Sequence, residues 1–218
     1  HDVVTDSPEN NFCNLNTNFA DRTANTVSEG ALKVVTSTSG RSYNAGSFLL
    51  RRGTGKWWWE YRAHNAACGM GVARVNGKTG VGAYESLTST STGCRTTDYY
   101  YGANNWGTYQ HTIVHNGSAV VTFSGSASYP QIYGVLVDTD TSSPNLEYYI
   151  NGSAVGNIDL DLQYDFIPII GDGSGGVSRT LDVNFGQNPT FNGEETAGSN
   201  TDSEGFGLFS QAVPSGAK

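Results

Sequence analysis

The sequence predicts an all-β fold, a sandwich of antiparallel sheets, and three observations lead to this expectation. Strand-length runs rich in β-branched and aromatic residues end at Gly, Asn or Asp, as in KWWWEYRAH, YGVLVDTD, LEYYING and TLDVNFG. No window shows apolar residues at helical spacing over three turns. The composition, with 28 Gly, one Met and 15% charged residues, suits short strands joined by turns. At 218 residues the chain can bury one core, so we expect a single domain, 1–218.

The expected strands follow one another along the chain. Residues 1–49 form a lead-in with one short strand-like run, ALKVVTSTS, between polar turns. From Gly53 the strand-length runs GKWWWEYRAH, GMGVARV, GVGAYESL and TTDYYYG alternate with turn residues, a spacing typical of a sandwich. After Gly186 the sequence is rich in Gly, Ser and Asn, and we expect residues 192–218 to form a covering segment, either a loop or an edge strand around GFGLFSQAV.

Asn-Gly dipeptides mark the expected turns, because both residues tolerate the positive φ of tight hairpins. They stand at 76–77, 116–117, 151–152 and 192–193. Asn116 and Asn151 also begin Asn-Gly-Ser glycosylation sequons, which are modified only in a eukaryotic secretory route. The hairpin interpretation is the preferred one.

The charge balance and hydropathy exclude two classes of partner. With 20 acidic and 12 basic residues the net charge is −8, so binding to a phosphate backbone is not favoured and we expect no nucleic acid. The sequence has neither an apolar run of about 18 residues nor a charged-then-apolar N-terminal signal, so we expect no membrane insertion. The start at His1 suggests a processed or excised piece.

The three cysteines, Cys13, Cys68 and Cys94, cannot all pair within one chain, and none forms a Cys-x-x-Cys metal spacing. We expect buried or free thiols. A Cys68–Cys94 disulfide stays open, because spacing along the sequence does not give the Cα separation that a disulfide requires.

Three stretches, in order, resemble the SPRY (B30.2-like) domain family. GKWWWEYRA followed by GMGVARV is similar to its glycine-lysine-aromatic strand and the strand after it. YGVLVDTDTSSPNLEYYING resembles its central hairpin, and FIPIIGDGSGGVSRTLDVNFGQNPTF resembles its closing segment. The agreement extends over about residues 50–191. The resemblance implies a bent antiparallel β-sandwich related to the legume-lectin (concanavalin A-like) jelly roll, used as a binding module without enzymatic activity or cofactor.

The two ends of the chain extend this resemblance to SPRY modules of bacteriophage and marine viral structural proteins. SPENNFCNLN and EGFGLFSQAVPSGAK carry it. It implies a piece of a longer, virion-surface protein, in a homo-oligomeric assembly, with loops that contact other virion proteins or a host-surface protein or glycan. The loops are rich in Gly, Ser and Thr, and the family's binding residues cannot be transferred onto them.

Glu147, in PNLEYYING, raises an alternative, because a carboxylate followed by two tyrosines resembles the nucleophile strand of family 11 xylanases. A retaining glycosidase needs a second carboxylate about 5 Å away. Glu194, Glu195 and Glu204 stand in turn-like sequence instead. We therefore expect a structural hairpin in which Leu146, Tyr148 and Ile150 face the core and Glu147 and Tyr149 face the other side.

Two further groups suggest chemistry that their surroundings do not support. Asp138 and Asp140 resemble the start of an EF-hand loop, but Ser143 replaces the required Gly and Tyr149 the bidentate Glu. We expect the two aspartates to cap a hairpin. The histidines His64, His111 and His115 complete no metal motif and are assigned no chemistry.

Aromatic residues give the candidate binding residues. Trp58 must point opposite to Trp57 and Trp59 on a pleated strand, and we expect burial between the sheets and beneath a covering loop. In GANNWGTYQ, by contrast, Trp106 and Tyr109 lack strand periodicity. With Asn105 they could stack on a sugar or anchor a protein. A carbohydrate-binding, lectin-like module is therefore the second hypothesis.

Overall fold

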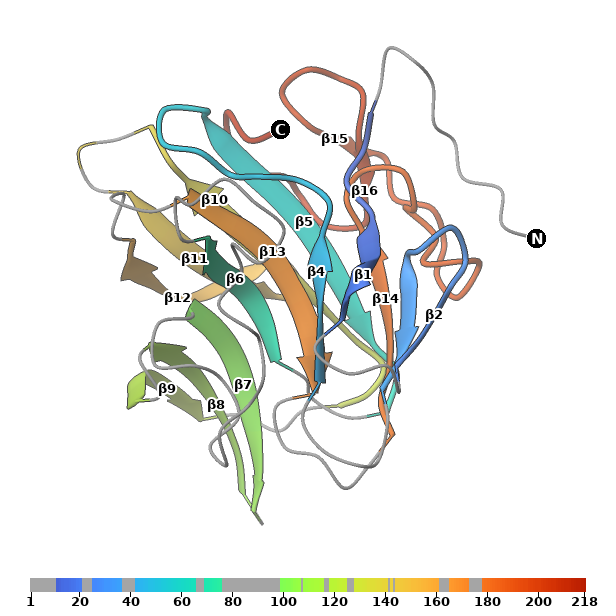
Figure 1. Cartoon of the computed structure of the whole chain (residues 1–218), viewed down its shortest axis with the longest axis vertical. Helices are drawn as coiled ribbons and strands as arrows, with labels where there is room; N and C mark the ends of the chain where they lie inside the picture. Colours follow the sequence, from blue (N-terminus) through green and yellow to red (C-terminus); the bar gives the residue numbers. More distant parts are fainter. Residues whose placement is uncertain are drawn as a thin grey trace.

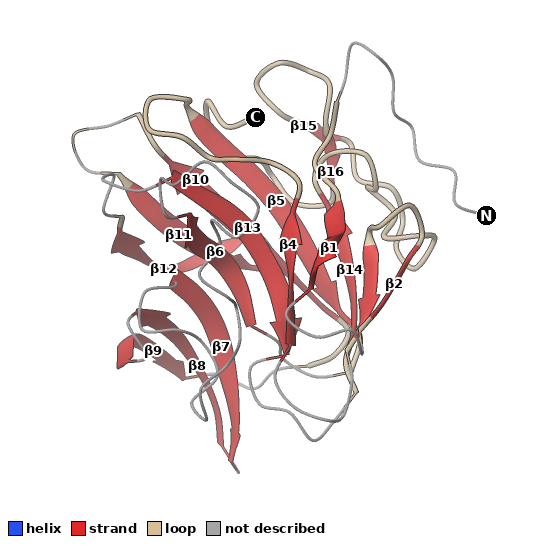
Figure 2. Ribbon diagram, viewed as in Figure 1, coloured by secondary structure: helices blue, strands red, loops and turns tan. Residues whose placement is uncertain are grey.

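The computed structural model describes residues 11–20, 25–36, 42–65, 69–75, 99–106, 108–115, 118–124, 128–140, 142, 144–160, 165–172 and 178–218. In these segments every regular element is a strand, and the strands form two seven-stranded sheets and a two-stranded ribbon (Figure 2). The predicted all-β sandwich is confirmed. No helix in this part of the chain is long and apolar enough to span a membrane.

The first sheet lies in front of the second in Figure 1, and its paired strands are all antiparallel. In spatial order it consists of β1 (Leu15–Ala20), β4 (Ser42–Gly46), β13 (Asp165–Asp172), β6 (Gly69–Val75), β7 (Tyr99–Trp106), β8 (Thr108–His115) and β9 (Ser118–Ser124).

The second sheet is antiparallel too, and β5 lies at its centre. Its order is β12 (Ser153–Asp159), β11 (Asn145–Ile150), β10 (Gln131–Asp138), β5 (Lys56–Ala63), β14 (Thr180–Asn184), β3 (Lys33–Val35) and β2 (Thr26–Ser28). The ribbon pairs β15 (Asn200–Thr201) with β16 (Leu208–Phe209).

The main core lies between the two sheets. Tyr61 and Tyr148 from the second sheet meet Met70 and Phe166 from the first, and all four are at most 1% exposed. Two hydroxyls cross the interface, because Tyr61 donates to the carbonyl of Ile169 and Tyr148 to that of Met70, each at 3.1 Å. A buried tyrosine hydroxyl needs such a partner. These bonds therefore fix how the sheets sit on each other.

The outer face of the second sheet is covered by residues 186–218, called here the C-terminal segment. Trp58 and Leu136, on this face, pack with Phe209 and Ala217 in a second apolar cluster. Gly134 lies beneath the indole of Trp58, where an added Cβ would stand only 2.0 Å from a ring carbon. The prediction that the tryptophans of β5 divide between an inter-sheet core and a covering segment is confirmed.

The hairpin turn predicted at Asn151-Gly152 is also present, between β11 and β12. Ile150 pairs with Ser153, so Asn151 and Gly152 form a two-residue turn, with φ of 47° and 82°. Two positive φ values are typical of a type I′ turn. The Asn-Gly pairs at 76–77 and 116–117 lie outside the described residues.

Candidate functional site

A pocket opens where β14 leaves the second sheet. β14 pairs with β5 only along residues 60–63, and the last pair joins Asn184 to Glu60. The first half of β5 therefore does not pair with β14. Lys218 bonds to this first half of β5 instead. The Trp58 amide donates to the Lys218 carbonyl at 2.9 Å, and the Lys218 amide donates to the Lys56 carbonyl at 3.0 Å. No strand of the described segments fills the space between β14 and Lys218.

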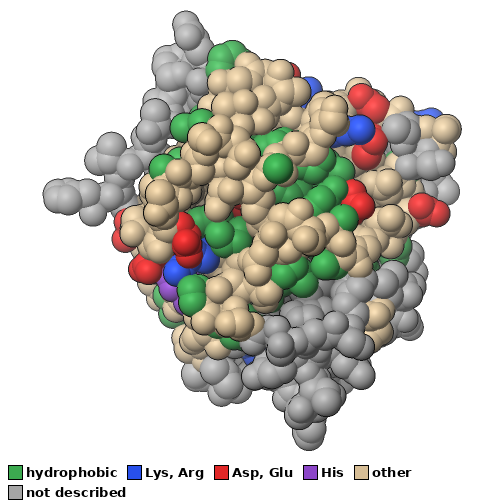
Figure 3. All heavy atoms as spheres, turned by 180° about the vertical axis from the view of Figure 1, so that it is seen from behind, with side chains coloured by type: hydrophobic (Ala, Val, Ile, Leu, Met, Phe, Trp, Pro, Cys, Tyr) green, Lys and Arg blue, Asp and Glu red, His purple; other side chains and the backbone are tan. Residues whose placement is uncertain are grey.

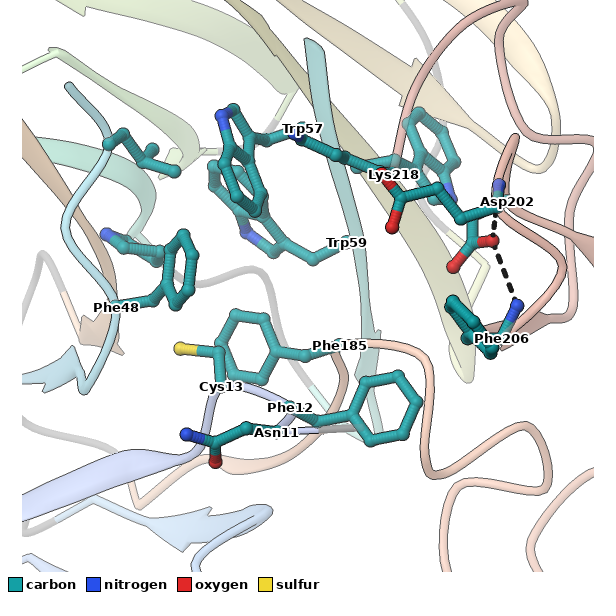
Figure 4. Close-up of a pocket in the computed structure, with 14 residues that line it drawn as sticks. Asn11, Phe12, Cys13, Phe48, Trp57, Trp59, Phe185, Asp202, Phe206 and Lys218 are labelled. Atoms are coloured by element: carbon teal, nitrogen blue, oxygen red, sulfur yellow. Dashed lines mark hydrogen bonds between the residues drawn. The ribbon is translucent and has the colours of Figure 1, made fainter. Parts of the chain in front are cut away.

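Aromatic side chains from distant parts of the sequence line this pocket, whose volume is about 260 Å³ (Figure 4). They come from β5, from the segments before β1 and after β4, from the end of β14 and from the C-terminal segment. The aromatic lining residues are Phe12, Phe48, Trp57, Trp58, Trp59, Phe185 and Phe206. Leu50, Cys13 and Pro168 complete an apolar floor, and Asn11, Asp202, Glu204 and Lys218 add polar groups.

Residues 202–207, the rim loop, form one wall of the pocket and are held in shape by one carboxylate. Asp202 accepts hydrogen bonds from the amides of Glu204, Phe206 and Gly207 at 3.0, 3.0 and 2.7 Å. The loop is tied to its surroundings as well, since the amide of Ser203 donates to the carbonyl of Ala217. Phe206 is thus presented on a preformed loop, with 55% of its surface exposed.

Lys218 and Cys13 contribute two different kinds of surface to the pocket wall. The ammonium of Lys218 stands 4.8 Å from the ring centroid of Trp57, within cation–π range. Cys13 is buried, as predicted, and burial raises the pKa of its thiol to about 11. The thiol therefore stays protonated at neutral pH and contributes apolar surface to the floor. Cys68 and Cys94 lie outside the described residues.

Glu60 fastens the C-terminal segment beside the pocket. Its buried carboxylate accepts hydrogen bonds from the amides of Ser210 at 3.0 Å and Gln211 at 2.6 Å, and from Asn184 Nδ2 at 3.1 Å. Desolvation raises the pKa of Glu60, and these bonds offset part of the shift. The rim loop is therefore built onto a segment whose position depends on a buried carboxyl group.

A charged cluster continues along the same outer face. The buried side chain of Arg62 donates to Glu195 at 2.7 Å and contacts His64, which is hydrogen-bonded to the buried carboxylate of Asp182. Figure 3 shows basic, acidic and histidine side chains gathered at one place on this face. Within the described segments no group of His, Cys, Asp or Glu side chains is arranged to hold a metal ion. The cluster joins the C-terminal segment to β5 and β14.

The predicted hairpin residues take the positions expected of them. Leu146 and Tyr148 are buried in the main core, whereas Tyr149 packs against Trp58 on the other face and donates its hydroxyl to Glu147 at 2.8 Å. Burial, together with the hydrogen bond and charge of Glu147, raises the pKa of Tyr149.

Asp138 and Asp140 cap backbone amides, but not both in the hairpin turn. Asp138 accepts from the amide of Asp140 at 3.0 Å, as expected for a turn. Asp140 instead accepts from the amide of Gly55 at 2.9 Å, in the loop before β5. The prediction is thus right for Asp138 and wrong for Asp140, whose partner lies 85 residues away in sequence.

The structure places Asn105, Trp106 and Tyr109 in a strand hairpin, and the expectation that this stretch lacks strand structure is wrong. Asn105 pairs with Tyr109, and Trp106 with Thr108, where β7 meets β8. These strands lie at the bottom of Figure 1 and the C-terminal residues at the top. The binding role of the three residues stays a prediction.

The pocket residues were missed by reasoning from the sequence. Trp57 and Trp59 stand out in the sequence as aromatic residues of a strand, but nothing in KWWWEYRA shows that β14 ends early beside them. Phe206 carried a weak signal, as an aromatic residue in a Gly-rich stretch, EGFG.

Comparison with known proteins identifies the fold. A scan against models of protein families found no match, and neither did a search of curated proteins. Among solved structures, the SPRY domain of human HERC1 matches with a TM-score of 0.53 and 15% identity, over 78% of this chain and 96% of that one. The PSpry domain of TRIM65 matches with a TM-score of 0.55 and 15% identity, over 79% of this chain and 89% of that one.

The chain has a SPRY-type fold. The motifs that carry the sequence resemblance occupy neighbouring positions within it. GKWWWEYRA forms β5, the stretch from 133 to 152 forms most of the β10–β11 hairpin, and TLDVN forms β14, and these strands are consecutive in the second sheet. GMGVARV and FIPIIGD form β6 and β13, which pair in the first sheet of the SPRY-type fold.

Proposed function

We propose that the chain is a non-enzymatic binding module that takes a partner protein at the aromatic pocket. The observation that carries this proposal is the preformed cavity of about 260 Å³, with an aromatic floor and an exposed phenylalanine on its rim. Concave apolar sites with a few polar groups are typical of binding sites, and aromatic residues supply much of the energy at protein interfaces. The resemblance to SPRY domains, which implies a binding module, supports the same proposal.

The test is a peptide-library selection on the immobilised chain, followed by measurement of Kd for the selected peptides by fluorescence anisotropy. Phe206→Ala is expected to weaken binding about tenfold or more, as for removal of an aromatic anchor. Leu208→Ala is the matched control, because Leu208 is also an exposed apolar residue, at 41%, and does not line the pocket. Equal effects of the two variants would contradict a site at the pocket.

The lectin-like alternative is tested in the same way with a glycan array. Trp106 pairs with Thr108, and Asn105 pairs with Tyr109, where β7 ends and β8 begins. Trp106 and Tyr109 therefore stand close together in the register of this turn. Glycan binding that is lost in Trp106→Ala and kept in Phe206→Ala would support a carbohydrate site at this turn. Binding that is lost in Phe206→Ala alone would assign the glycan to the pocket.

We also propose that the module is displayed on a virion, as one copy in a larger assembly, where it meets other virion proteins or a host-surface protein or glycan. The support is the resemblance of SPENNFCNLN and EGFGLFSQAVPSGAK to the ends of viral SPRY modules. Immunogold labelling of purified particles with an antibody against the chain tests this. Labelling that is absent from intact particles would contradict surface display.

A further inference from the structure

The rim of the pocket carries more negative than positive charge. Asp202 and Glu204 both line it, against one lysine, Lys218. Within the described part of the chain, neither carboxylate takes part in an ion pair. The three amides that bind Asp202 hold its carboxylate in place, and Glu204 is exposed. A ligand group that enters here meets fixed negative charge above an aromatic floor.

Lys218 shows which kind of group the aromatic wall accepts. Its backbone is paired with β5, and its ammonium lies over the face of Trp57 at 4.8 Å (Figure 4). Trp57 is itself fixed, because its indole Nε1 donates to Thr54 Oγ1 at 3.1 Å and its ring packs against Phe48 with 4.5 Å between centroids. The pocket thus already holds one alkylammonium group, which the chain itself provides.

The size of the pocket limits what else can enter. At about 260 Å³ it is smaller than the roughly 300–1,000 Å³ of pockets that enclose whole small molecules. A single large side chain is the group that fits. An apolar side chain would bring apolar surface toward the two carboxylates and would supply no counter-charge of its own, which is unfavourable.

Building on the proposed binding role, we propose that the pocket takes an arginine side chain of the partner protein, and that Lys218 competes with it. A guanidinium stacks on aromatic faces and binds carboxylates in a fork geometry, so it can contact Trp57 and Glu204 together. Lys218 then acts as an internal competitor that occupies the Trp57 face until the partner's cation displaces it.

The experiment uses three peptides that differ at one position, Ac-Gly-Gly-Xaa-Gly-Gly-NH₂, with Xaa arginine, citrulline or leucine. Citrulline has nearly the shape of arginine without its charge. Binding to the whole chain is followed by NMR, through the indole N–H resonance of Trp57. The arginine peptide is expected to shift this resonance saturably and to bind at least about tenfold more tightly than the citrulline peptide, as for a desolvated charge-assisted contact.

Two charge variants separate the effect of Glu204 at the pocket from the effect of the net charge of the protein. Glu204→Gln is expected to weaken arginine binding about threefold or more, whereas Asp159→Asn, which removes the same charge from an exposed position on β12, leaves it unchanged. Lys218→Met keeps the apolar stem and removes the competing ammonium, so binding should strengthen by about threefold. Equal weakening by Glu204→Gln and Asp159→Asn would overturn the proposal.

The outcomes distinguish this inference from the proposed function. If the leucine peptide binds as tightly as the arginine peptide and Phe206→Ala weakens both, the pocket is an apolar anchor site, and only the inference about arginine is wrong. If no peptide shifts the Trp57 resonance, even in Lys218→Met, the arginine inference is overturned. The binding role is then judged by the library selection alone.

Discussion

The two faces of β5 are buried to a similar degree by different means. On the inner face, Trp59 and Tyr61 pack between the sheets among apolar side chains. On the outer face, Glu60 and Arg62 are 0% and 5% exposed beneath the C-terminal segment, where backbone amides and charged side chains hold them. The difference shows that one strand can be central to two kinds of packing, one set by shape and the other by polar pairing.

The largest effect is expected on the inner face, from Tyr61→Ala. It removes a buried ring and leaves the carbonyl of Ile169 and the indole N–H of Trp59 without their partner. We expect the free energy of unfolding to fall by about 4 kcal/mol, measured by urea titration. Tyr61→Phe, which keeps the ring, should lose about 1–2 kcal/mol. Equal losses in the two variants would show that the ring does not stabilise the core.

On the outer face, Glu60→Ala is expected to cost about 2–3 kcal/mol, because it leaves the backbone amides of Ser210 and Gln211 without their acceptor. The effect should be local. Hydrogen exchange is expected to accelerate at Ser210 and Gln211 before it accelerates in the inter-sheet core. Glu147→Ala, on the same outer face of the sheet, is the control. A uniform increase over the whole chain would contradict a separate role for the outer face.

The pH dependence of stability sharpens the same comparison, because Glu60 is a buried acid whose pKa is raised from 4.5, chiefly by desolvation. A folded pKa above the unfolded one means that folding favours the protonated form. Its contribution to stability is full below the unfolded pKa and is lost as pH rises through the folded pKa. The stability of the parent relative to Glu60→Gln should therefore fall over this window, as followed by urea titrations at several pH values. Parallel profiles would refute the assignment.

The sequence predicted the inner face and the burial of Trp58 beneath a covering segment, but not the buried charged residues of the outer face, and there is a physical reason for this. Alternation in KWWWEYRA and LEYYING places Tyr61 and Tyr148 in a core, because side chains on a strand alternate between its faces. Glu60 reads as a surface residue, since charged residues are rarely buried. Its partners include backbone amides 150 and 151 residues away, and amides carry no sequence signal.

The pocket was hidden for a related reason. It depends on where β14 stops pairing, and Gly186, with φ of 113°, is where the chain turns away beneath Phe12. A glycine after NF in NFGQ is compatible with continued strand or with a turn. The choice between them is made by tertiary contacts of the N-terminal and C-terminal segments.

A smaller effect is expected at the β11–β12 hairpin turn, which bonds to the C-terminal segment. Gly152 has φ of 82°, and its amide donates to Gln211 of the C-terminal segment at 2.8 Å. A Cβ added there would meet no atom within 4 Å, so Gly152→Ala tests backbone strain alone. We expect a loss of about 1 kcal/mol, seen as a lower Tm. An unchanged Tm would show that the turn relaxes without cost.

The smallest effect is expected from Glu147→Gln, which separates the structural role of this carboxylate from a catalytic one. Glu147 accepts the Tyr149 hydroxyl at 2.8 Å, and an amide oxygen can accept the same bond. Stability should therefore change by less than about 1 kcal/mol.

The same substitution should lower the pKa of Tyr149, because the carboxylate that helps to raise it is gone, and an alkaline absorbance titration measures this. Tyr149→Phe is the control that removes the titrating group. If Glu147 were a glycosidase nucleophile, a reducing-sugar assay on glycan substrates would show release by the parent and none by Glu147→Gln. A lower Tyr149 pKa with no sugar released by either protein would instead identify Glu147 as the hydrogen-bond partner that holds Tyr149 against Trp58 on the outer face.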